Sequence, residues 1–222
     1  SAGTSVLLDS AISAIGSLSV TAGTADSQSG SITGIFYTDL SVLGEDSSIA
    51  LTAGASGGSI QLTDSDLAAA RVDLTALSGS VLHGPNGLID TVQLHMLASA
   101  GIAAQTQAET ITAVVSSAGD IRIRNLSGLQ LEADTADGFI EVSAAGTIDA
   151  VQVLARGDSQ NNGISLSALS ATAGSFSNIL LGSVMTSDTG DITLRATGRV
   201  EGLADIVVDA QGLRAHSVTI MA

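Results

Sequence analysis

Acidic and amide side chains gather in two segments that have the right chemistry to bind a metal ion. The first contains Asp158, Asn161 and Asn162, and the second contains Asp188 and Asp191. Ca²⁺ prefers about six to eight oxygen ligands from carboxylates, amides and carbonyls, so these five residues are candidate calcium ligands. Asp and Asn are also favoured in tight turns, because their side chains hydrogen-bond to the nearby backbone. Calcium is therefore a candidate cofactor, and turn formation is the alternative.

A second set of residues has the chemistry of a carbohydrate-cleaving site. Two carboxylates can cleave a glycosidic bond when they lie about 5 to 9.5 Å apart, and Asp64 and Asp66, followed by Arg71, form the best such cluster. However, the chain has no Lys to neutralise an acidic sugar and no Trp on which a sugar ring could stack. We therefore expect a protein that is not an enzyme and assign no catalytic residue. A carbohydrate-binding or carbohydrate-cleaving protein is the alternative.

The three histidines have no spacing that predicts a local metal site. His83, His95 and His216 are separated by long stretches of chain, and His95 is opposite in phase to its apolar neighbours Val92 and Leu94. We expect the His95 side chain to point into solvent. The chain also has no Gly-x-Ser-x-Gly elbow that is followed by a helix, the context of a serine nucleophile, and no Lys to complete a phosphate-binding loop.

The charge balance excludes some classes of partner. The 222 residues hold 7 Lys+Arg against 22 Asp+Glu, a net charge of -15. Nucleic acids bind proteins through clustered basic side chains, and so do anionic membranes; we expect neither as a partner. No apolar run reaches the roughly 18 residues of a membrane span. The first residues lack the basic region of a signal peptide, so we expect a processed product or an excised fragment.

The elements that must position these residues are short β-strands. Segments such as 120–125, 139–144 and 191–196 alternate apolar with small or polar residues, which is the pattern of a half-buried strand. Many of them begin just after a Gly or a Gly-Asp pair, where the chain can turn. The sequence therefore predicts an all-β protein.

Two ladders of apolar residues recur at a nearly constant spacing. Steps between successive members run from 19 to 28 residues, and the two ladders are offset by about half a repeat. The first ladder is Val72, Val92, Ile111, Leu131, Val151, Ile179 and Ile206, and the second is Ile60, Val81, Ile102, Ile121, Ile140, Ile164 and Ile192. Such a period indicates stacked repeats that bury their apolar faces against one another.

These spacings predict a single-stranded parallel β-helix, a solenoid with about 20–28 residues per coil. We expect it to be right-handed, because parallel crossover connections almost always are. Residues 1–222 should form one domain, with a less regular start over 1–48. The longer steps late in the chain predict protruding loops at 157–163 and 171–178.

The pattern Gly-x-Ile-x-Leu, as in residues 58–62 and 190–194, resembles filamentous-haemagglutinin-like bacterial surface proteins. The resemblance covers about residues 49–220 and is one of period and composition. It implies a β-helical shaft segment of a repetitive adhesin that is secreted or held at the bacterial cell surface. On this basis we expect a structural rod or stalk segment of an adhesin or extracellular fibre. Expected partners are other copies or segments of the same long chain, stacked end to end, and a cell-surface or glycan partner.

Overall fold

The computed structural model describes residues 5–23, 30–34, 38–157, 162–170, 177–186, 190–197, 200–202 and 213–221. Within these ranges the regular structure consists of β-strands that pair in parallel, and it includes no helix. Consequently, the described part of the chain holds no helix long and apolar enough to cross a membrane. The predicted all-β, parallel β-helical fold is confirmed. Its handedness remains a prediction.

The chain divides into two compact units, Ser1–Ala108 and Glu109–Ala222. Strand β9 (Gly101–Ala118) begins in the first unit and ends in the second. The prediction that residues 1–222 form one domain remains a prediction.

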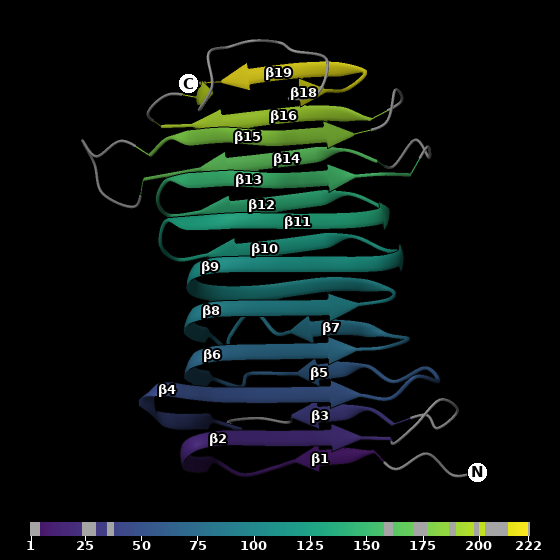
Figure 1. The fold of residues 1–222 in the computed structure, drawn as a ribbon, viewed down its shortest axis with the longest axis vertical. Coiled ribbons are helices and arrows are strands. Elements are labelled where there is room, and N and C mark those ends of the chain that lie inside the picture. The colour runs from purple at the N-terminus through teal and green to yellow at the C-terminus, as the bar shows by residue number, and fades with distance from the viewer. Residues whose placement is uncertain are drawn as a thin grey trace. The chain divides into compact units, whose positions relative to one another are not determined.

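In unit 1, short and long strands alternate along the chain, and each strand pairs with the next strand of its own kind (Figure 1). One short and one long strand together make a coil. The short strands are β1 (Val6–Leu8), β3 (Ile32–Gly34), β5 (Ile60–Leu62) and β7 (Ser80–His83), and the long ones are β2 (Ile12–Ala22), β4 (Leu40–Ala53), β6 (Leu67–Ala76) and β8 (Ile89–Ala98). Residues before 48, where the sequence is less regular, thus contain paired strands as well.

Unit 2 is built in the same way, with two interleaved series of parallel strands. The first series is β10 (Ile121–Asn125), β12 (Ile140–Ala144), β14 (Ile164–Ala168), β16 (Asp191–Ala196) and β19 (Ser217–Met221). The second is β11 (Leu129–Asp137), β13 (Ile148–Ala155) and β15 (Ile179–Thr186), which pairs with both β17 (Val200–Gly202) and β18 (Leu213–Arg214). The predicted loops fall largely on residues 158–161 and 171–176, outside the described residues.

The second sequence ladder matches the strand register within each unit. Ile60 pairs with Val81 and Val81 with Ile102 in unit 1. In unit 2, a continuous column joins Ile121, Ile140, Ile164 and Ile192. All of these side chains are at most 2% exposed. Fully burying such a side chain stabilises a fold by about 1.5–3 kcal/mol, so the columns form the core of each unit.

The first ladder is correct at Ile111 and Leu131, which pair, and wrong at Val92 and Val151. A further member, Ile179, is buried but pairs with Ile148, outside the column of Leu131. Val72 pairs with Leu94 rather than Val92, and Leu131 pairs with Ala150 rather than Val151. Val92 and Val151 are 46% and 37% exposed. Both lie where a long strand bends and two successive residues face outward. A bulge of this kind shifts the inward phase by one residue, which strict alternation cannot show. The last ladder member, Ile206, lies outside the described residues.

Candidate ligand-binding pocket

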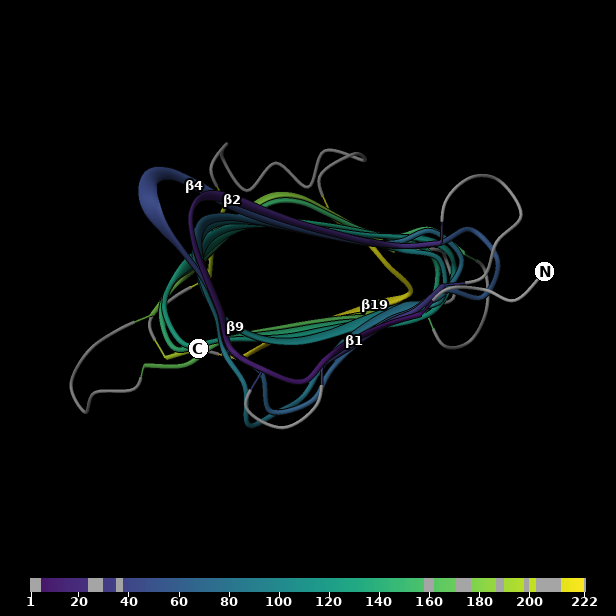
Figure 2. The same ribbon diagram turned by 90° about the horizontal axis from the view of Figure 1, so that it is seen from below.

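Strand β4 carries an insertion at the corner where the long strands of unit 1 bend. Ser41 pairs with Ala68 and Ser48 with Arg71, so residues 42–47 of β4 lie opposite only residues 69–70 of β6. The surplus projects beyond the neighbouring strand β2 (Figure 2). Gly44, with φ of 127°, supplies the left-handed backbone that this excursion requires.

An open pocket of about 430 Å³ lies beside this insertion. Its walls combine two carboxylates, one guanidinium, an amide and small or aliphatic side chains. The lining residues are Glu45, Asp46, Ser47, Ser48, Ala70, Arg71, Val92 and Gln93. They come from β4, β6 and β8, three successive long strands. Charged and polar side chains from successive coils therefore converge at this corner.

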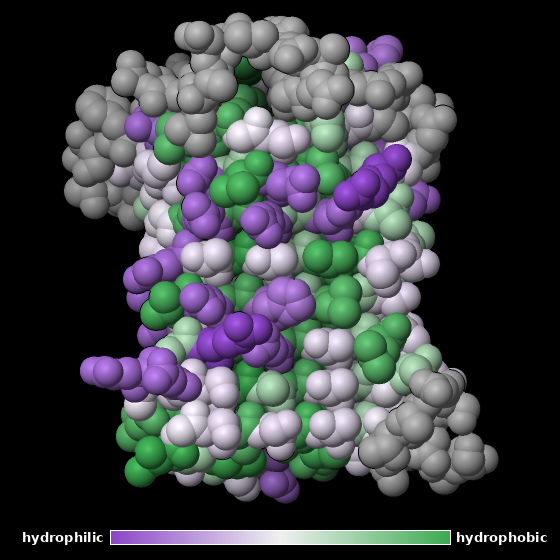
Figure 3. Space-filling view, viewed as in Figure 1, coloured by the Kyte–Doolittle hydropathy of each residue, from purple (hydrophilic) through white to green (hydrophobic). Residues whose placement is uncertain are grey.

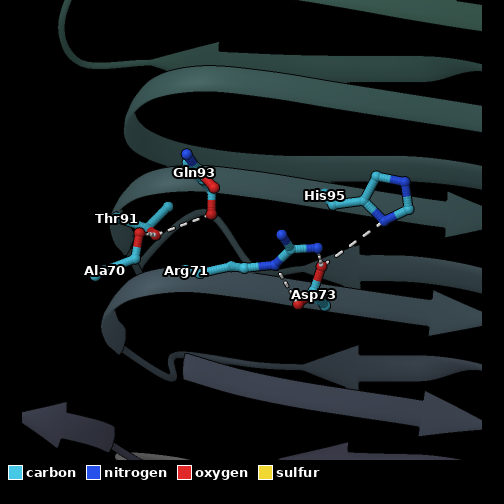
Figure 4. Close-up of polar contacts among 6 residues, drawn as sticks. All are labelled: Ala70, Arg71, Asp73, Thr91, Gln93 and His95. Carbon is cyan, nitrogen blue, oxygen red and sulfur yellow. Dashed lines mark hydrogen bonds and ion pairs between the residues drawn. The ribbon is translucent and has the colours of Figure 1, made fainter. Parts of the chain in front are cut away.

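The wall of the pocket continues into a fixed ion pair on β6. Arg71 donates from Nε and Nη2 to the two carboxylate oxygens of Asp73, at 2.8 and 2.9 Å (Figure 4). The hydrogen bond to Asp73, followed by its negative charge, raises the pKa of the guanidinium. His95, on β8, lies outside this pair, with Nδ1 3.9 Å from an Asp73 oxygen. Figure 3 shows hydrophilic side chains gathered over β6 and β8 and projecting at the left end of β4, and weakly polar ones over β2 and the rest of β4.

Two hydroxyl groups hold the bend that forms the pocket floor. Ser47, which is 2% exposed, accepts a hydrogen bond from the Ala70 N–H at 2.9 Å. Thr91 donates to the Ala70 carbonyl at 3.0 Å and approaches the Gln93 carbonyl at 3.1 Å. These bonds satisfy backbone groups that the bend removes from the strand ladder, which buried structure requires. The floor is therefore fixed by specific contacts on both sides.

Each residue of the carboxylate cluster expected from the sequence has a hydrogen-bond partner outside that cluster. Asp64 has φ of 53° in a turn and accepts a hydrogen bond from Asn86 Nδ2 at 2.8 Å. Asp66 accepts one from the Leu88 N–H at 2.8 Å. Arg71 pairs with Asp73 instead. The pair of Arg71 and Asp73 could have been predicted from the sequence, because residues two apart on a strand share a face.

The candidate calcium ligands fall into two groups. Asp158, Asn161 and Asp188 lie outside the described residues. Asn162 is 1% exposed, and its side-chain oxygen accepts a hydrogen bond from the Gly138 N–H at 2.8 Å. Asp191 is exposed and accepts one from the Ser217 hydroxyl at 2.7 Å. Among the residues that the structure describes, no three His, Asp or Glu side chains are grouped to hold a metal. Calcium binding remains a prediction.

The histidines occupy different environments. His95 is partly exposed on the outer face of β8, as expected, and His216 is exposed. His83 is buried; its Nε2 donates to the Ser65 carbonyl at 2.8 Å, and its Nδ1 has no partner among the described residues. Burial lowers the pKa of His83, opposed by the hydrogen bond to Ser65 and the charge of Asp66. Alternation from the ladder member Val81 could have predicted this buried imidazole, because residues two apart on a strand share a face.

No protein-family model, curated protein or solved structure matches this chain.

Proposed function

We propose that this chain is a structural segment of a secreted or cell-surface bacterial adhesin or extracellular fibre. The supporting observations are the in-register stacking of coils and an apolar strand, β19, whose side chains no other described residue covers. The resemblance to filamentous-haemagglutinin-like proteins, seen in the repeat pattern of residues 58–62 and 190–194, points to the same role. In this role the protein acts mechanically, because stacked backbone hydrogen bonds resist bending and stretching.

Strand β19 exposes apolar side chains that continue the core columns of unit 2. Val218 and Ile220 stack on Ile192 and Leu194, which are both 0% exposed. Val218 and Ile220 continue these inward columns, yet they are 42% and 55% exposed. An uncovered strand edge with apolar side chains favours pairing with a further strand. We infer that another coil, from a further segment of the same long chain or from a second copy, covers β19.

The net charge of -15 fits this role, because like charges keep a chain rich in apolar residues soluble. The alternative of a carbohydrate-binding or carbohydrate-cleaving β-helix predicts sugar binding at the pocket beside β4.

Self-stacking is tested by sedimentation velocity over a range of protein concentrations. We expect the unmodified chain to form larger species as its concentration rises, and Ile220→Lys to remain monomeric. Leu82→Lys is the control, because Leu82 is 42% exposed on the outer side of β7, in unit 1, whereas β19 belongs to unit 2. A monomer at all concentrations, or equal behaviour of the two variants, would refute stacking between copies through β19.

The location is tested separately. Antibodies raised against this chain should label the surface of intact source bacteria or the fibres around them, and external protease should remove the label. Labelling only after the cells are opened would contradict the proposal.

A further inference from the structure

Apolar side chains flank the β4 insertion on both sides. Ile15 and Leu43, paired in register on β2 and β4, are 86% and 61% exposed. Val92, on the other side, lines the pocket and is 46% exposed. Large exposed apolar side chains that gather at one place, rimmed by polar groups, are typical of an interaction surface. We call these three residues and the pocket the corner surface.

The charged groups of the corner surface are not equivalent. Arg71 is neutralised by its bidentate pair with Asp73. Glu45 and Asp46 are exposed at the tip of the insertion, and neither makes a hydrogen bond or ion pair among the described residues. The surface therefore presents two uncompensated negative charges between apolar side chains, on a chain whose net charge is already -15.

This chemistry selects one class of occupant. Anionic ligands are repelled by Glu45, Asp46 and the net charge. Sugars usually require an aromatic platform, and none of the pocket's lining residues is aromatic. A protein segment that alternates basic and apolar residues matches both features. In an extended segment, successive side chains point to opposite faces. A segment that sits edge-on in the pocket therefore directs its cations at the β4 insertion and its apolar groups at Val92 of β8.

We propose that the corner surface binds an extended basic segment of a partner protein. Its Lys or Arg side chains pair with Glu45 and Asp46, and its apolar side chains pack on Val92. The partner is a different protein, because the one alternating basic and apolar segment of this chain, Ile121–Arg124, lies in strand β10, where Ile121 and Ile123 are 0% and 3% exposed. This inference does not depend on stacking through β19, and either proposal can fail alone.

The test uses a fluorescein-labelled hexapeptide of alternating Lys and Val, with fluorescence anisotropy as the measurement of binding. We expect saturable binding to the full chain that weakens as salt is added, because exposed ion pairs are screened. Hexapeptides of alternating Glu and Val, and of alternating Lys and Ser, should bind weakly or not at all. Equal binding of the Lys–Ser peptide would mean that charge alone acts, and would overturn the proposal.

Matched variants locate the site. Glu45→Gln with Asp46→Asn should weaken binding about fivefold, the effect of two exposed ion pairs, and Val92→Ser should weaken it several-fold. Glu132→Gln with Glu141→Gln removes the same charge from exposed positions in unit 2 and should leave binding unchanged. Circular dichroism checks that every variant folds. Equal weakening in both double variants, no weakening in either, or displacement of the peptide by neutral oligosaccharides would each refute the inference.

Discussion

Replacing Val151 or Val153 by alanine removes the same two methyl groups from neighbouring positions of β13. Strict alternation along the strand would place both side chains inward. In the structure, Val151 faces outward at the bend and is 37% exposed, whereas Val153 is 0% exposed and pairs with Val184 on β15. The bulge therefore predicts two different costs for one chemical change.

The magnitudes follow from burial. Each buried methylene-sized group contributes about 0.8 kcal/mol, so Val153→Ala loses about 1.6 kcal/mol of transfer free energy. The cavity that it leaves raises the cost to about 2–3 kcal/mol. Val151 is partly exposed at a corner that can relax, and its replacement should cost about 1 kcal/mol or less. For a chain of this size, 1 kcal/mol corresponds to about 2–4 °C in Tm.

Urea unfolding followed by circular dichroism measures both variants against the unmodified chain. Because stacked repeats can unfold in parts, amide hydrogen exchange should be recorded for β11, β13 and β15. We expect Val153→Ala to lower protection in these strands and Val151→Ala to leave it nearly unchanged. Equal destabilisation by the two variants, or a larger effect of Val151→Ala, would refute the bulge and the register derived from it.

Three further perturbations test other parts of the structure. The pKa of His83 is lowered below its ordinary 6.5, so the unfolded chain takes up a proton before the folded chain does as the pH falls. The free energy of unfolding should therefore decrease below about pH 6.5. Urea titrations should show a smaller decrease for His83→Asn, and an identical decrease would contradict this. Asp134→Asn removes the bidentate pair that joins Asp134 of β11 to Arg156, at 2.6–3.0 Å; it should cost about 0.5 kcal/mol, less at high salt, and a loss of several kcal/mol would be inconsistent with an exposed pair. The calcium hypothesis predicts that millimolar Ca²⁺ raises Tm and that Asp191→Asn reduces this rise; a Tm that Ca²⁺ leaves unchanged would remove calcium from the account.

The sequence predicts the fold well because the core of a stacked coil repeats. Ile140 and Ile164 lie on one column because each occupies the same place in its own coil, and this place recurs in the sequence as a spacing. Bends do not repeat in this way. Val92 looks like a core residue until the bulge that turns it outward is known.

The candidate site was harder to predict, because it depends on differences between coils. The insertion in β4 forms a pocket only because β6 and β8 have no matching insertion. A search for repeats ignores a feature that occurs in one coil alone. Turn residues raise a similar difficulty. The side chain of Asn162 has the chemistry of a metal ligand, yet it is buried and its oxygen accepts a hydrogen bond from the backbone of the preceding coil. Composition alone does not separate these two uses.

The stacking of coils is tested most directly by distances between spin labels on one outward column of unit 1. Thr21, Thr52, Thr75 and Leu97 occupy equivalent positions on β2, β4, β6 and β8. The chain has no native Cys, so pairs of introduced cysteines can be labelled without interference. With Leu97 labelled in every pair, the separation should rise by about 5 Å per coil, from Thr75 to Thr52 to Thr21. Distances that do not rise in this order would contradict the parallel β-helix and the structural role proposed for it.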